Sequence, residues 1–384
     1  MSSGLRVLLI DDQASVRTVL EGALEEDEGP AGDGSGWVVR GQGFDGVDDA
    51  LIGFRPDMVV LDLVEGEVSD ERNSGNRSFD RIRDVWFCPV VVYTGFAEER
   101  SFEDHPLVVL VPKGVSSEEK VLVELHKFVS VARMIRSVHD DFDARIREAL
   151  RDSVDALERQ IPVGSESHDA VLSRAVRRQV AARVDLAASA GTALRAWERF
   201  LVPPLGHDLL TADLLRRRGG EWDDPGAFCM VLTPSCDLVS SGDRIPKVER
   251  VLVAWCEPLR QLGKMQLEPG KPLSQGQRNS LHPILTEGML DRHLIVPEFR
   301  GHVPLMAANL KRLELVEWKR IDLRRNGRHA EGAELVRAAS TDSPFREMAV
   351  WAYLKVTGRP GMPDTDIERW LGEISGHLET GGSA

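Results

Sequence analysis

The sequence predicts an α/β fold, with a doubly wound five-stranded parallel sheet, a long helical connector and a C-terminal mixed α+β domain. Three observations support this prediction. Short Val-, Leu- and Ile-rich runs alternate with helical patterns in the first third of the chain. A nearly heptad apolar pattern without proline then covers 117–161. After Gly206, short strand-like runs are separated by Gly and Pro.

The predicted strands of the first third lack polar alternation, which is typical of parallel strands buried on both faces. Helical patterns lie between them, and this alternation predicts a doubly wound sheet. The predicted strands are Leu5–Ile10, Trp37–Gly41, Met58–Leu61, Val90–Tyr93 and Val108–Val111, and the predicted helices are Ser15–Glu26, Val47–Phe54, Ser78–Val85 and Glu98–Phe102.

Polar residues follow these strands at the sheet edge where doubly wound folds bind ligands. Asp11 and Asp12 follow the first strand and Asp62 the third, while Thr94 and Lys113 follow the fourth and fifth. One Asp in such a place is most often a helix cap, but all five together indicate a site. Converging carboxylates repel each other and suit a hard divalent cation such as Mg²⁺. One carboxylate could then attack phosphorus, while the lysine and threonine contact phosphate oxygens.

The motifs LLIDDQ, VVLDL, VVVYTG and VPKG resemble the receiver domain of two-component response regulators, the CheY-like family, over about residues 4–130. The resemblance implies phosphorylation by a partner histidine kinase or phosphotransfer protein. It implies a catalytic set of Asp62, Thr94 and Lys113, and a Mg²⁺ site of Asp11, Asp12, Asp62 and the backbone carbonyl of Val64. Leu110 stands where many receivers have an aromatic switch residue.

The connector is predicted to form a homodimer. Apolar residues recur at spacings of mostly three and four from Val121 to Ile161, which is typical of a helix with a partner along its stripe. One continuous helix would span about 65–70 Å; a break near residues 139–141 is the alternative. A second helical pattern covers Asp169–Phe200 and ends at Pro203-Pro204. The two helices predict an antiparallel hairpin, and two copies a four-helix interface.

The predicted domains are the receiver at 1–116, the helical dimerisation stalk at 117–204 and an α+β output domain at 205–384. Of the net charge of −14, residues 1–114 carry −13, with 23 Asp and Glu against 10 Lys and Arg. Neither part is basic, which argues against DNA as a partner. The chain has no apolar run long enough for a membrane span and no secretory leader, so we expect a cytoplasmic protein.

The output domain is distinctive in the segment Thr-Pro-Ser-Cys-Asp-Leu at 233–238. Cys236 beside Asp237 could be a nucleophile if a base lies near. A zinc site is a second alternative, and small buried core thiols are a third. The zinc ligands would come from Cys229, Cys236 and Cys256 with His282 or His293. Strands are predicted at 228–232, 248–254, 293–296 and 313–318, and helices at 343–357 and 364–378.

Three functions are compatible with these patterns. In the first, a response regulator is phosphorylated on Asp62, and its stalk relays the signal to an output domain that binds a partner protein. In the second, the receiver gates an enzyme with a thiol or zinc site around Cys236. In the third, a degenerate receiver is only a dimerisation scaffold. The intact carboxylates, Thr94 and Lys113 argue against the third, and the first is our prediction.

Overall fold

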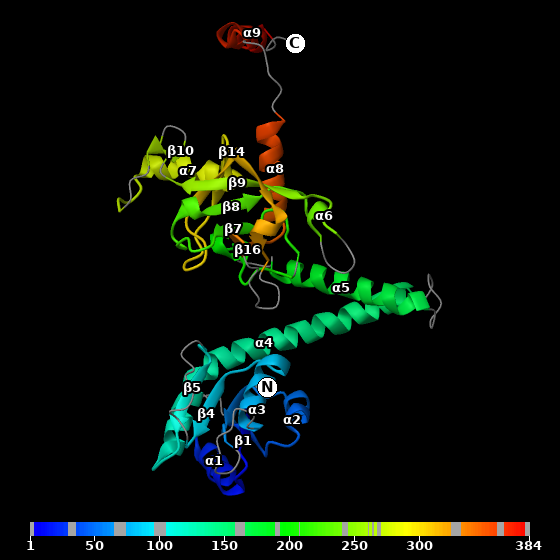
Figure 1. Cartoon of the computed structure of the whole chain (residues 1–384), viewed down its shortest axis with the longest axis vertical. Coiled ribbons are helices and arrows are strands. Elements are labelled where there is room, and N and C mark those ends of the chain that lie inside the picture. Colours follow the sequence, from blue (N-terminus) through cyan, green and yellow to red (C-terminus); the bar gives the residue numbers. More distant parts are fainter. Residues whose placement is uncertain are drawn as a thin grey trace. The chain divides into compact units, whose positions relative to one another are not determined.

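The chain forms two compact units, Met1–Gly191 and Thr192–Ala384, drawn from blue to green and from green to red in Figure 1. The computed structural model describes residues 4–29, 36–64, 74–95, 105–157, 166–188, 193–206, 208–239, 245–259, 261–262, 265–266, 270–323, 332–358 and 365–380. Each unit has hydrophobic cores of its own. The predicted helix at Glu98–Phe102 lies outside the described residues.

The first unit contains the predicted parallel sheet, with strand order β2-β1-β3-β4-β5. Its strands are β1 (Arg6–Ile10), β2 (Val38–Gln42), β3 (Met58–Leu61), β4 (Val90–Thr94) and β5 (Val108–Pro112), and its shorter helices are α1 (Ala14–Glu26), α2 (Val47–Phe54) and α3 (Ser74–Val85). All four strand pairings are parallel. The strand order reverses between β1 and β3, which makes their carboxyl ends the expected ligand-binding edge.

Both faces of this sheet are covered, as its continuous apolar runs predict. Leu8 and Ile10 of β1 face a core shared with α2 and α3. Val7 and Leu9 face the opposite core, which α1 and the long helix α4 (Ser117–Leu157) complete. Successive side chains of each strand point into the two cores in turn. Both sets of positions must therefore be apolar, and the strands show no polar alternation.

The long helix α4 runs for 41 residues without a break. Its first half belongs to the core of the first unit, since Val121, Leu125 and Ala132 are each at most 1% exposed. This part of the apolar pattern, expected to face a second copy, therefore packs against the sheet instead. The reason is that an apolar stripe along one side of a helix can pack on a sheet as well as on another helix.

The middle of α4 is attached to the sheet edge opposite the carboxyl ends. Arg136 Nη1 donates to Asp57 Oδ2 over 3.2 Å, just before β3. The ring of His139 stacks on Trp86, with ring centroids 4.5 Å apart. Farther along, Asp143 pairs with Arg55, whose guanidinium lowers the pKa of that carboxyl. The helix thus crosses the whole sheet before it leaves the domain.

Beyond the sheet, α4 packs against α5 (Glu166–Ala188). Ala149 and Ser153 of α4 are buried, and Arg183 of α5 pairs with Asp152 of α4. The predicted extension of this helix to Phe200 is wrong in its last part. Residues 196–199 form the 3₁₀ turn η1 (Ala196–Arg199) and β6 (Phe200–Leu201) follows, because strand pairing with β16 outweighs helical propensity there.

The second unit is built on a nine-stranded, mostly antiparallel sheet in the order β12-β13-β14-β9-β8-β7-β16-β15, with β6 paired to β16. Its remaining strands are β7 (Leu214–Arg217), β8 (Phe228–Val231), β9 (Arg250–Pro258), β12 (Met289–Leu290), β13 (His293–Val296), β14 (Met306–Glu317), β15 (Ile321–Asp322) and β16 (Leu335–Thr341). The hairpin β10 (Gln261–Leu262) and β11 (Met265–Gln266) stands apart. The β-rich prediction for this region is confirmed.

This sheet curls into a partial barrel. β14 and β15 are five strand positions apart, roughly 24 Å along a flat sheet at about 4.8 Å per step. The chain joins them through the turn η3 (Trp318–Arg320) alone, and these four peptide steps span at most about 14 Å. The sheet must therefore bend to bring β14 toward β15. A core that includes Leu215, Cys229 and Val253 fills the concave side.

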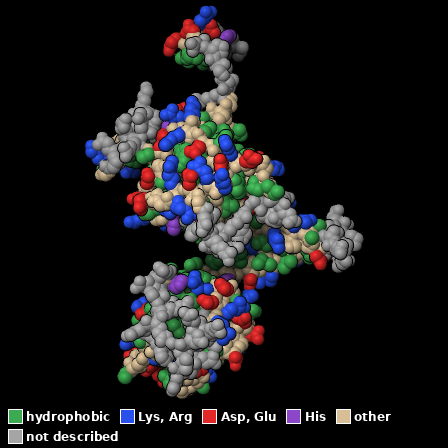
Figure 2. Space-filling model, in the orientation of Figure 1, with side chains coloured by type: hydrophobic (Ala, Val, Ile, Leu, Met, Phe, Trp, Pro, Cys, Tyr) green, Lys and Arg blue, Asp and Glu red, His purple; other side chains and the backbone are tan. Residues whose placement is uncertain are grey.

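The helices of the second unit are α6 (Ser235–Leu238), α7 (Gln275–Glu287), α8 (Phe345–Thr357) and α9 (Ile367–Thr380), with a 3₁₀ turn η2 (Pro225–Ala227) before β8. Ala349 and Ala352 of α8 pack on the other face of the sheet. Within the described residues, no helix has both the length and the hydropathy to cross a membrane. Figure 2 shows a face of this unit where Lys and Arg side chains are interspersed with Asp and Glu.

Candidate functional site

Three carboxylates meet at the carboxyl ends of β1 and β3. Ile10 and Leu61 are register partners, so Asp11 and Asp62, each the next residue along, leave neighbouring strands at the same level. With Asp12, they offer ligand oxygens that all lie within 4.8 Å of one another. Asp11 and Asp62 are buried, and Asp12 is partly exposed. The structure therefore brings together the acidic residues that the sequence singles out.

Lys113 reaches the same point from the end of β5. Its Nζ lies 2.8 Å from Asp11 Oδ2 and 2.6 Å from Asp62 Oδ2. Its backbone N–H donates to the carbonyl oxygen of Thr94 over 2.9 Å, which fixes the approach of the side chain. Burial opposes the charged form, but the hydrogen bonds with Asp11 and Asp62 raise the pKa of Lys113. The lysine is therefore a permanent cation between two carboxylates.

Asp11 has a raised pKa because burial disfavours its charged form. The lysine and the backbone N–H of Gln13, which donates to Asp11 Oδ1 over 2.8 Å, oppose this effect. A divalent cation would reverse the effect of burial by supplying charge at the carboxylate. Asp11, Asp12, Asp62 and Lys113 together carry three negative charges and one positive charge. This donor set of hard oxygens fits Mg²⁺ in both charge and ligand type.

Asp62 is held in a narrow space, with its side chain 6% exposed. Its Oδ1 accepts a hydrogen bond from the N–H of Val64 over 3.3 Å. On the α3 side, Gly75 lies so close that an added Cβ would meet Leu63 O at 2.3 Å and Asp62 O at 2.5 Å. Only glycine allows the first turn of α3 to pack on the backbone of Asp62. The contact limits how far this segment can move.

Thr94 ends β4 and is fully buried, in register with Pro112 of β5. It thus lies between the strands that carry Asp62 and Lys113. Leu110, at the position that resembles an aromatic switch, is partly buried against the core of α2 and α3. The positions of Thr94 and Leu110 are those expected from the sequence, and their roles remain predictions.

Tyr93 is a residue near the site that the sequence analysis missed. Lys113 Nζ lies 5.5 Å from its ring centroid, and its hydroxyl lies 2.6 Å from Ser117 Oγ. Ser117 begins α4 and also donates to the carbonyl oxygen of Gly114 over 2.8 Å. Tyr93 therefore links the site lysine to the start of the long helix. The only signal in the sequence is its place next to Thr94 at a strand end.

The cysteines of the second unit do not come together with histidines. Cys229 and Cys256 are buried in opposite cores, and burial raises the pKa of both thiols. Cys236 is exposed on α6, with its Sγ 3.7 Å from Asp237 Oδ1. His293 pairs instead with Glu257 over 2.7 Å. Over the described part of the chain, the one His, Cys, Asp and Glu cluster suited to a metal is that of Asp11, Asp12 and Asp62.

The Thr-Pro-Ser-Cys-Asp-Leu segment has a structural role after β8. Thr233 Oγ1 accepts from the backbone N–H of Leu252 over 2.7 Å. Ser235 Oγ accepts from the backbone N–H of Thr211 over 3.0 Å. Leu238 is fully buried in the barrel core. The polar residues of the segment therefore satisfy backbone groups at the barrel end.

Comparisons with known proteins concern about a third of the chain. No family model matches the sequence, and no curated protein matches it. Among solved structures, the response regulator domain of Thermotoga maritima CheB is 20% identical over 34% of this chain and 96% of that one, with a TM-score of 0.26.

Two further structures give the same picture. The N-terminal domain of a response regulator/sensory box/GGDEF protein from Carboxydothermus hydrogenoformans is 17% identical over 34% of this chain and 97% of that one, with a TM-score of 0.26. The response regulator PhyR from Brucella abortus is 21% identical over 36% of this chain and 53% of that one, with a TM-score of 0.27. The five-stranded parallel sheet in the order 2-1-3-4-5, with its helices, gives the first unit the flavodoxin-like doubly wound fold that response-regulator receiver domains share.

Proposed function

We propose that the chain is a two-component response regulator that accepts a phosphoryl group on Asp62 from a partner histidine kinase or phosphotransfer protein. One observation carries the proposal, which is the meeting of Asp11, Asp12 and Asp62 with Lys113 at a single sheet edge. A buried ion pair alone would need only one carboxylate for the lysine. Three carboxylates around one lysine are better explained by a site for a cation and a phosphoryl group.

The residues have separate roles in this proposal. A carboxylate oxygen of Asp62 forms the new P–O bond while the P–N bond of the donor phosphohistidine breaks, and the electron pair stays on the imidazole nitrogen. Lys113 exchanges its contact with Asp62 for one with a phosphoryl oxygen. Asp11, Asp12, Asp62 and the carbonyl of Val64 would hold Mg²⁺, which supplies charge neutralisation at the phosphoryl oxygens. The buried Thr94 hydroxyl donates to the phosphoryl group and moves with it.

The signal then passes to α4 through Tyr93. Loss of the Lys113–Asp62 contact moves the ammonium group that lies above the Tyr93 ring. The Tyr93–Ser117 hydrogen bond carries this change to the first turn of α4. Since α4 is also attached at Asp57 and Trp86, it responds as one rigid rod. The output domain binds a partner protein in the cytoplasm, and its mixed surface charges do not favour DNA.

Phosphorylation is tested on the full chain with acetyl phosphate as a small-molecule donor. We expect Mg²⁺ to allow incorporation of one phosphoryl group per chain, measured by intact-protein mass spectrometry. An excess of a chelator should reduce incorporation at least tenfold, because three carboxylates without their cation repel the incoming anion. Incorporation that is equal with and without the chelator would exclude the metal site.

We further propose that the chain is a homodimer through the outer half of α4. Its exposed apolar side chains recur every four residues, and each is 40–48% exposed. They are Val138, Phe142, Ile146, Leu150 and Val154. On α5, a groove of about 440 Å³ is lined by three small apolar residues and three polar ones, which are Val171, Ala175, Ala182, Arg174, Arg178 and Gln179. A second copy of the hairpin would cover both.

The dimer is tested by light scattering at micromolar concentration. We expect wild-type protein to have twice the mass of the chain, and Phe142→Asp with Leu150→Asp to weaken association at least tenfold, because buried carboxylates lack partners there. Val123→Asp is the matched control, since Val123 is an exposed apolar residue of the same helix but lies beside the sheet. A wild-type monomer, or equal weakening by the control, would contradict the proposal.

A further inference from the structure

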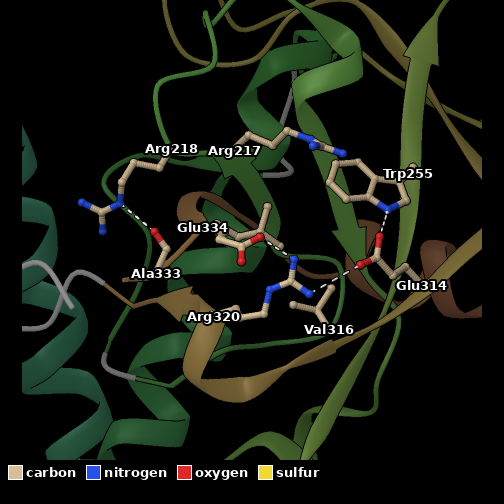
Figure 3. A pocket seen from close by; sticks show the side chains of 9 residues that line it. Arg217, Arg218, Trp255, Glu314, Val316, Arg320, Ala333 and Glu334 are labelled. Carbon is tan, nitrogen blue, oxygen red and sulfur yellow. Dashed lines mark hydrogen bonds and ion pairs between the residues drawn. The ribbon is translucent and has the colours of Figure 1, made fainter. Parts of the chain in front are cut away.

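The mouth of the partial barrel in the second unit holds a cavity of about 370 Å³. Figure 3 shows its lining, which comes from β7, β9, β14, β16 and the crossing between β14 and β15. Mouths of β-barrels are common ligand sites, and this volume lies within the range of pockets for small molecules. The cavity belongs to neither the phosphorylation site nor the helical hairpin.

The cavity combines an apolar floor with a charged rim. The floor is formed by residues that also belong to the barrel core, which are Trp255, Val316 and Leu335. Trp255 is fixed in place because its indole Nε1 donates to Glu314 Oε2 over 2.7 Å. An indole that is held by a hydrogen bond gives the site a rigid planar wall.

Two of the three arginines at the rim are matched by carboxylates. Arg320 pairs with Glu334, and its Nη1 lies 3.8 Å from Glu314 Oε1. Arg218 pairs with Asp322 over 3.0 Å. These pairs fix the shape of the rim, and Figure 3 shows those of Arg320 with Glu334 and Glu314. Because their charges are balanced, they leave little attraction for an added anion.

Arg217 is the exception among these cations. Its guanidinium carbon lies 4.3 Å from the ring centroid of Trp255, so the group stacks on the indole. Across the described residues, no carboxylate oxygen lies within 4.0 Å of it, although Arg217 contributes, after Arg320, to lowering the pKa of Glu334 at the same rim. The side chain is exposed and faces the cavity (Figure 3). A guanidinium held flat by stacking keeps its N–H donors free for a planar oxyanion, and little side-chain entropy is lost on binding.

We propose that this cavity binds a small organic anion, with one carboxylate or phosphate group on Arg217 and an apolar or planar body against Val316 and Leu335. The shared chemistry is an oxyanion that accepts two parallel hydrogen bonds from the guanidinium. A second anionic group would face Glu314 or Glu334, so the site favours ligands with a single charged end. The output domain would then respond to a metabolite as well as to phosphorylation of the receiver.

The test uses full-length protein labelled with 5-fluorotryptophan, in which fluorine NMR resolves the eight tryptophans and Trp255→Phe assigns the relevant signal. Benzoate and phenyl phosphate are the probes, and benzamide is the neutral analogue of benzoate. We expect at least one of the two anions to shift the Trp255 signal saturably at millimolar concentration. Benzamide should leave it unchanged, and Arg217→Gln should weaken binding at least tenfold.

Arg216→Gln is the matched control, because Arg216 is the preceding residue of β7 and points to the opposite face of the sheet. It should bind the anions as wild type does. Three results would overturn the proposal. They are a Trp255 signal that neither anion shifts, an equal shift with benzamide, and unchanged affinity in Arg217→Gln. Acetyl phosphate labelling of each variant should match wild type, which keeps this outcome separate from that of the phosphorylation test.

Discussion

Asp62→Asn is expected to abolish covalent phosphorylation by acetyl phosphate while the first unit stays folded. The substitution keeps the shape of the side chain but removes the nucleophilic charge. An amide can still accept the hydrogen bond from the Val64 N–H, so the local backbone needs no rearrangement. In the proposal Asp11 and Asp12 hold the cation, so no other carboxylate of the cluster is assigned to accept the phosphoryl group. The measurement is intact mass followed by peptide mapping.

The control for this variant is Asp49→Asn, which removes a carboxylate from the exposed face of α2. It should be phosphorylated as fully as wild type. Transfer of the label to Asp11 or Asp12 in Asp62→Asn would contradict the assignment of the acceptor. Full incorporation in Asp62→Asn, at any residue, would remove the basis of the proposed function.

Arg337→Met is expected to destabilise the second unit by about 3–5 kcal/mol, the usual cost of leaving one partner of a buried ion pair alone. Arg337 and Asp213 are both fully buried, and Arg337 Nε lies 2.7 Å from Asp213 Oδ2. The guanidinium also donates to the carbonyl oxygen of Leu205 over 2.8 Å and to Ser340 Oγ over 2.8 Å. Its loss would leave the buried carboxylate without a charged partner, with the Leu210 N–H still donating to Oδ2, and the Leu205 carbonyl without this donor.

The pH dependence of this variant follows from Asp213. Burial already raises the pKa of Asp213, and Arg337 opposes that effect. Without the arginine, the folded-state pKa rises further above its unfolded value. The folded variant then binds a proton more readily than the unfolded chain, so its penalty shrinks as the pH falls and grows as the pH rises. Urea unfolding at pH 5 and pH 8 should therefore show the larger loss at pH 8.

Two comparisons separate this effect from a general loss of charge. Arg369→Met removes an arginine from an exposed pair with Glu373 on α9 and should change stability little. Asp213→Leu combined with Arg337→Met should recover part of the loss, because no buried charge then remains. If the double variant is less stable than Arg337→Met alone, the argument from an uncompensated charge is wrong.

The receiver fold is readable from the sequence because burial on both sheet faces leaves a simple signature. β1, β3 and β4 each contain an uninterrupted apolar run, and the acidic residues directly follow β1 and β3. Because parallel strands have their carboxyl ends at the same edge of the sheet, the position of Asp11, Asp12 and Asp62 after these strands places them together at that edge. Tyr93 was not predicted, since its contact with Ser117 depends on how β4 and α4 meet in three dimensions.

The second unit was predicted less completely for physical reasons. β7 was missed because its sequence is two leucines followed by two arginines. This order lacks the apolar–polar alternation of a strand and is compatible with one side of a helix. β16 was missed because Arg337 interrupts it, and a sequence cannot show that Asp213 neutralises this charge in the core. The helix α7 contains Pro283, which normally argues against a helix. In β16, the distant partner Asp213 thus overrides the local pattern.

The way α4 crosses the sheet determines where the receiver could be separated from the rest of the protein. A fragment that stops at residue 116 lacks Val121, Leu125 and Ala132, whose side chains complete one face of its core. A fragment cut at residue 133 would still leave Asp57 without Arg136 and Trp86 without His139. The smallest piece that keeps all of these contacts therefore ends beyond Asp143, so any chimera that replaces the rest of the chain should be joined there, within the helix.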